Sequence, residues 1–146
     1  MRLAFCFSMK AIAVQSSWPP QSRRSELIWR SFQLAFILMT LESIVNPRSE
    51  DRDVCDLLWV PTGGGKTEAY LALAAFTIAF RRRRALARPS GDRTGAGVSV
   101  ISRYTLRLLT IQQFRRAVKM MTACEYLRAD GLDAHSMRQV QRSLRA

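Results

Sequence analysis

Apolar side chains recur at three- and four-residue steps in three parts of the chain, the spacing that indicates an amphipathic helix. The first part spans residues 25–46 and the second begins at position 66, runs to about 80 and continues into an arginine run. The third spans residues 108–128, and Gly131 is placed as its stop signal. We therefore predict three long helices at these positions.

Two short apolar runs, Val54–Val60 and Val98–Ser102, have the length and composition of buried strands in a parallel sheet. Pro61 ends the first run, and the loop Pro89–Gly97 precedes the second. The resulting order of helix, strand, helix, strand, helix predicts right-handed crossovers between parallel strands. The expected fold class is therefore α/β, with a short parallel sheet flanked by helices.

The length of 146 residues allows one domain at most. Residues 1–24 show no steady period and contain Pro19-Pro20, so they are interpreted as a leader or linker. Residues 25–130 are expected to form the domain, and residues 131–146 a tail to which no role is assigned.

Basic side chains are concentrated in the second part of the chain. The whole chain has 23 Lys+Arg and 11 Asp+Glu, for a net charge of +12; residues 1–80 hold 8 basic and 7 acidic side chains, and residues 81–146 hold 15 and 4. The basic part is where a polyanion such as nucleic acid would bind. The alternative is that the arginine content reflects codon composition and that Arg81–Arg84 is a solvated helix end.

The three cysteines, at positions 6, 55 and 124, are odd in number and widely spaced. They form neither a disulfide framework nor a metal-binding pair, which indicates a reducing, cytoplasmic setting. Cys55 and Cys124 are expected in the core. The longest apolar stretches fall short of the ~20 residues that a membrane-spanning helix needs, so no membrane association is predicted.

The residues that carry chemistry lie between the first predicted strand and the second helix. Glycines let backbone N–H groups turn toward an anion, and the start of the helix adds the positive end of its dipole. Lys66 is placed to reach the β- and γ-phosphates, and Thr67 to place its hydroxyl on Mg²⁺. The sequence therefore predicts ATP and Mg²⁺ as cofactors, held by Thr62, Gly63, Gly64, Gly65, Lys66 and Thr67.

The strict form of this phosphate-binding pattern requires glycine at position 60, where the chain has Val60. A plain glycine-rich turn between a strand and a helix is the alternative, but such a turn has no need of Lys66-Thr67 at its exit.

Pro61–Thr67 resembles motif I of superfamily-two helicases and translocases, whose first position is commonly not glycine. Upstream, Trp29–Gln33 resembles the Arg-x-x-Gln segment that precedes this motif. The resemblance implies a partial RecA-like P-loop NTPase domain in which Gln33 reads the adenine edge and Arg30 or Phe32 shapes the pocket. The alternative for Gln33 is a polar residue on an amphipathic helix.

Arg103–Gln113 resembles motif Ia of the same family, with Tyr104 in place of proline and the glutamine one position late. The resemblance implies that Arg103, Thr105 and Arg107 contact a nucleic-acid backbone, which positions a strand without reading its bases. It favours DNA over RNA, although the residues themselves do not separate the two. The alternative is an ordinary basic start of a helix.

Together the two segments are similar to the helicase-like proteins of DISARM-type antiphage systems of bacteria, over about Arg30–Arg128. The resemblance implies the ATP-binding part of a helicase or translocase in phage defence, with other defence-system subunits as partners.

The resemblance also implies ATP hydrolysis, which in this family needs a Walker B Asp-Glu and a second lobe. Neither is recognised here, so the chain alone is expected not to turn over ATP, and Lys66 and Thr67 are its only residues from the catalytic motifs. The competing class is a basic nucleic-acid-binding module without ATPase activity, using Arg81–Arg84, Arg103, Arg107, Arg115 and Arg116. A P-loop kinase is disfavoured, since Pro61-Thr62 and the motif Ia-like segment have no role there.

Overall fold

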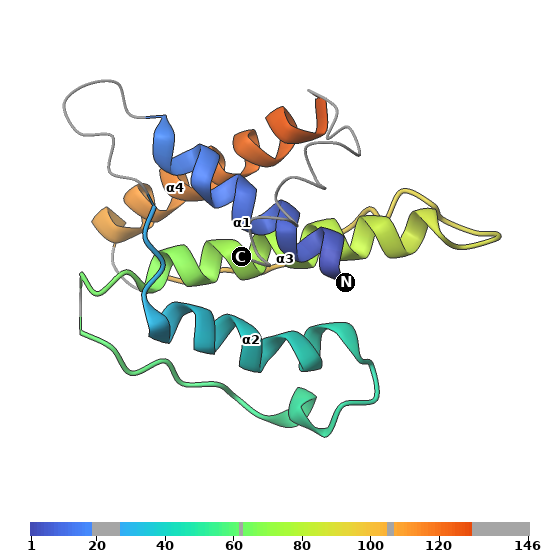
Figure 1. Ribbon diagram of the computed structural model, residues 1–146, viewed down its shortest axis with the longest axis horizontal. Coiled ribbons are helices and arrows are strands. Elements are labelled where there is room, and N and C mark those ends of the chain that lie inside the picture. The colour runs from blue at the N-terminus through green and yellow to red at the C-terminus, as the bar shows by residue number, and fades with distance from the viewer. Residues whose placement is uncertain (19–26, 62, 105–106, 130–146) are drawn as a thin grey trace, which may run out of the picture.

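The computed structural model describes residues 1–18, 27–61, 63–104 and 107–129, and the regular structure in this part of the chain is helical (Figure 1). Helix α3 lies between α2 on one side and α1 and α4 on the other, and it contacts all three. The elements in chain order are α1 (Arg2–Ser17), α2 (Ser31–Val45), the short 3-10 helix η1 (Glu50–Asp53), α3 (Lys66–Leu86) and α4 (Arg107–Ala129).

The three helices predicted from the apolar pattern are confirmed as α2, α3 and α4. The largest difference is at the start of α2, since residues 27–30 are not helical and Arg30 is the N-cap. The backbone N–H of Arg30 donates to Oε1 of Gln33 at 2.8 Å, which satisfies a donor at the helix end. The helix therefore begins where a side chain can cap it.

Helix α1 was not predicted, because its buried positions do not look apolar. The buried side is formed largely by small or polar residues, with Ile12 as its one large aliphatic member. The hydroxyl of Ser8 donates to the carbonyl of Phe5 at 2.8 Å, so this serine is buried without an unpaired group. The buried residues of α1 are Ala4, Cys6, Ser8, Ala11, Ile12 and Gln15.

The core lies along α3. Ala69, Ala72 and Ala75 are buried on this helix together with Phe76, whose ring stacks on Phe80 with centroids 5.7 Å apart. Alanine on α3 and the small residues on the buried side of α1 allow these two helices to pack closely. α1 has its most extensive contact with α3.

The predicted α/β fold, a partial RecA-like domain with a parallel sheet, is wrong: the described residues contain no strand. Val54–Val60 and Val98–Ser102 are extended but unpaired, and Trp59 and Ile101 are 89% and 87% exposed. In Figure 1 the first run passes along the outer side of α2 and the second along α3. A strand needs a neighbour about 4.8 Å away to pair its backbone, and neither run has one among the described residues.

Alkylation of the native protein is expected to modify Cys55 quickly and Cys6 and Cys124 slowly. Cys55 is exposed in the extended run, whereas the other two thiols are buried. Burial also raises the pKa of the Cys124 thiol to about 11, so little reactive thiolate forms at pH 8. Peptide mapping after a short pulse of iodoacetamide measures the order, with the denatured chain as the control. Protection of Cys55 would restore the buried-strand interpretation.

Candidate functional site

The glycine loop turns sharply just before α3. Gly63 and Gly65 have φ of 81° and 92°, the left-handed region that glycine adopts at no steric cost. The N–H of Gly64 donates to the carbonyl of Pro61 at 3.1 Å, closing a turn between the extended run and the helix. Gly65 is the N-cap of α3 and Lys66 its first residue. The loop therefore delivers the chain directly into the helix.

The start of α3 is suited to an anion. The first N–H groups of a helix have no partner within the helix, and they carry the positive end of its dipole. Gly65 has no side chain that could cap them. Lys66 is half-buried and its Nζ donates to the carbonyl of Val60, so the ammonium is held against the loop. The loop and the start of α3 thus supply both a positive charge and backbone donors.

Gln33 joins α2 to the glycine loop. Its Nε2 donates to the carbonyl of Gly65 at 2.7 Å, while its Oε1 accepts from the N–H of Arg30 at 2.8 Å. The residue is 4% exposed. A Cβ placed on Gly65 would lie 2.8 Å from Nε2 of Gln33, so a side chain at position 65 would push this carboxamide out of place. The structure thus brings together two of the predicted site residues, 32 positions apart.

Glu68 in the first turn of α3 is paired with Arg116 of α4. The pair fixes the end of α3 that bears the loop against the neighbouring helix. It also occupies the guanidinium of Arg116, which the sequence had placed among the nucleic-acid contacts. The 48-residue separation leaves no local signal for this pair, and sequence reasoning missed it.

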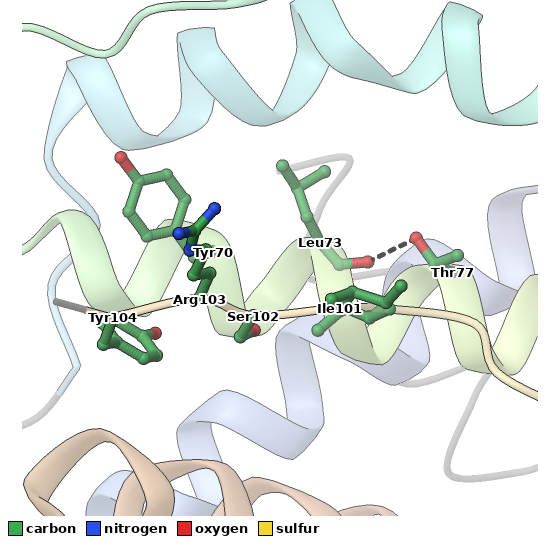
Figure 2. A pocket seen from close by; sticks show the side chains of 9 residues that line it. Tyr70, Leu73, Thr77, Ile101, Ser102, Arg103 and Tyr104 are labelled. Atoms are coloured by element: carbon green, nitrogen blue, oxygen red, sulfur yellow. Dashed lines mark hydrogen bonds between the residues drawn. The ribbon is translucent and has the colours of Figure 1, made fainter. Parts of the chain in front are cut away.

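A groove of about 350 Å³ lies between α3 and the extended residues 100–104 (Figure 2). One stripe of α3 forms a wall of the groove, and Arg103 and Tyr104 lie near its end beside Tyr70. The ring of Tyr70 is in edge contact with Phe36 of α2, with centroids 5.8 Å apart. The residues of the α3 stripe are Tyr70, Leu73, Ala74 and Thr77.

The other predicted site residues are placed as follows. Thr67 is half-buried in the first turn of α3, and Phe32 is half-buried on α2. Arg103 is exposed, whereas Arg107 is the first residue of α4. Thr62 and Thr105 lie outside the described residues. The roles assigned to all these residues stay predictions.

Some of the arginines proposed as polyanion contacts already bind within the chain. The guanidinium of Arg81 donates to the carbonyls of Ala96 and Val98 and ties the loop before the second extended run to α3. Arg82, Arg83 and Arg84 are exposed. The part of the arginine run that faces solvent is thus residues 82–84.

No three His, Cys, Asp or Glu side chains in the described part of the chain come together as a metal site. Among the described helices, none combines the length and apolar character that crossing a membrane requires.

Comparison with known proteins relates the chain to a DISARM protein. No family model matches the chain, and no solved structure matches it. Over 106 residues the chain is 55% identical to the DISARM protein DrmA of Bacillus paralicheniformis. The matched region is 73% of this chain but 9% of that protein, so the chain spans a small part of its relative's length. The predicted relation to a DISARM protein is confirmed.

Proposed function

We propose that this chain provides a site for the phosphates of ATP in a protein of a DISARM phage-defence system. The supporting observation is the geometry at residues 63–66, where two left-handed glycines lead directly into a 21-residue helix that begins with Lys66. The relation to DrmA supports the link to phage defence. We also propose the motor activity of a helicase or translocase and contacts with other defence subunits, for which this site would supply the nucleotide-binding part.

An open side of the loop at Gly63 supports the proposed phosphate site. Apart from Gly63 and its two neighbours in the chain, no described residue has an atom within 4 Å of the point where a Cβ on Gly63 would stand. Gly64 is crowded, because a Cβ there would lie 2.7 Å from Cγ1 of Val60. The open side at Gly63 admits an oxygen, while the packed side at Gly64 holds the loop in shape. A phosphate would give Lys66 a charged acceptor in place of the Val60 carbonyl.

Mg²⁺ fits this site only together with the nucleotide. Thr67 offers one hydroxyl, and the carboxylate of Glu68 is engaged by Arg116. Mg²⁺ keeps several waters and is commonly held by one or two protein groups plus phosphate oxygens. Thr67 would hold the ion on the protein side, and the ion would neutralise charge on the phosphates.

The test is ATP binding by isothermal titration calorimetry in 150 mM salt. Lys66→Ala is expected to weaken binding about tenfold or more, since the loop loses its charged donor. Lys119→Ala is the matched control, because it removes one exposed lysine from α4 and should leave the affinity within twofold. Equal losses in the two variants would mean that ATP binds through net charge, and the proposal would fail.

A second candidate function is nucleic-acid binding without sequence preference. The observation in its favour is the exposure of Arg82, Arg83 and Arg84 at the end of α3 and of Arg103 beside the groove. Exposed guanidinium groups can contact phosphates without breaking contacts within the chain. These side chains form the basic surface that we propose for a DNA backbone.

Affinity for DNA is expected to fall steeply as salt rises from 50 to 200 mM, with a log–log slope of about −0.7 to −0.9 for each phosphate contact. The double variant Arg83→Ala/Arg84→Ala is expected to make the log–log slope shallower by the amount that corresponds to nearly two phosphate contacts. Arg103→Ala should make it shallower by the amount that corresponds to one. Arg116→Ala is the control, because Arg116 is paired with Glu68. Fluorescence anisotropy with a labelled strand gives the slopes. A slope unchanged by the first two variants would exclude this surface.

A further inference from the structure

The carboxamide of Gln33 is buried and already hydrogen-bonded, so it is poorly placed to bind the base of a nucleotide. Both polar atoms of the side chain are hydrogen-bonded, and 4% of the residue is exposed. Each polar atom of the carboxamide has one hydrogen-bonding position left, but with so little of the residue exposed a base edge cannot reach it without moving Gln33 off the bond to Gly65 that holds the loop. The structure therefore points to another place for the base.

The groove beside α3 lies within reach of the loop. Tyr70 is four residues after Lys66, and at 1.5 Å per residue this places the near end of the groove about 6 Å along the helix from the loop. Arg103 and Tyr104 lie at that same end (Figure 2). A nucleotide with its phosphates at the start of α3 can thus extend along the helix into the groove.

The groove also has the chemistry of a base site. Leu73, Ala74 and Ile101 provide apolar surface, and Tyr104 provides an aromatic ring that is 42% exposed. Arg103 adds a positive charge near the end toward the loop, where the sugar and α-phosphate would lie. An apolar cleft of this size with a few polar groups is typical of small-molecule sites.

We propose that the groove between α3 and residues 100–104 holds the base of the nucleotide, stacked on Tyr104, while Gln33 is a positioning residue for the loop. The proposal rests on the proposed function, since the phosphates of the same nucleotide occupy residues 63–66. The ring of Tyr70, held by its contact with Phe36, forms a fixed wall at the end of the groove.

The test compares ATP with tripolyphosphate, which has the phosphates but no base. Wild-type protein should bind ATP about tenfold more tightly than tripolyphosphate, because stacking of the base on an aromatic side chain adds affinity. Tyr104→Ala is expected to remove this advantage and to leave the affinity for tripolyphosphate within twofold. Tyr104→Phe should keep it.

Two further variants make the comparison specific. Ala74→Met should fill the groove and weaken ATP alone, whereas Phe114→Ala removes a ring that is 68% exposed on α4 and should affect neither ligand. Thermal unfolding of each variant confirms that it is folded.

The outcomes separate the two proposals. Equal wild-type affinities for the two ligands, or equal losses in Tyr104→Ala, would overturn the groove as the base site and leave the phosphate site standing. Tripolyphosphate binding that does not depend on Lys66 would overturn the phosphate site, and with it the placement of the base.

Discussion

Phe76→Ala should lower the free energy of unfolding by about 3–5 kcal/mol, the usual cost of removing a fully buried ring from a core. Phe76 is 0% exposed in the middle of α3 and stacks on Phe80. A loss of this size is a large share of the 5–15 kcal/mol typical of a domain, so much of the variant would unfold on mild heating. Urea denaturation followed by circular dichroism measures the change.

Phe114→Ala removes the same side chain from the exposed side of α4 and should change the stability by less than about 0.5 kcal/mol. Comparable losses in the two variants would show that the core does not lie along α3.

Gln33→Ala should destabilise the protein by about 1–3 kcal/mol and loosen the glycine loop. The variant leaves the carbonyl of Gly65 and the N–H of Arg30 without their side-chain partner, and an unsatisfied buried polar group costs about this much. ATP and tripolyphosphate should be weakened by the same factor, since both need the loop in place. Calorimetric titration of the two ligands, with urea denaturation, checks both effects.

Gln33→Glu separates the two bonds of this side chain. A carboxylate can still accept from Arg30 but cannot donate to Gly65, so the helix cap should persist while the loop is released. Gln112→Ala, an exposed glutamine on α4, is the matched control. A loss confined to ATP in the Gln33 variants would instead assign Gln33 to the adenine edge.

The sequence pattern predicted the helices well because their signal is local. Residues three and four apart lie on one face of a helix, so burial leaves a period in the sequence. α1 was not predicted because Ser8 and Gln15 occupy part of its buried side and interrupt the apolar period. The spacing of small residues at positions 4, 8 and 11 was the signal that could have revealed it.

The sheet could not be judged by the same means, since a strand depends on a partner elsewhere in the chain. Val54–Val60 and Val98–Ser102 have strand-like composition, but composition does not supply the neighbour that pairs their backbones. The candidate site also contains one feature that is local in the sequence and one that is not. The glycine loop is a local pattern and could be predicted from the sequence. The Glu68–Arg116 pair joins distant residues and could not be predicted.

The packing of α1 determines which pieces of this protein can usefully be studied. A chain shortened to begin at residue 19 would lack α1 and expose to water the apolar part of α3 that α1 contacts. An uncovered apolar face of this kind promotes aggregation. If such a piece failed to bind nucleotide, the cause would be the absence of α1 from α3 and not a defect of the glycine loop. Biochemical work on the loop therefore has to retain residues 2–17.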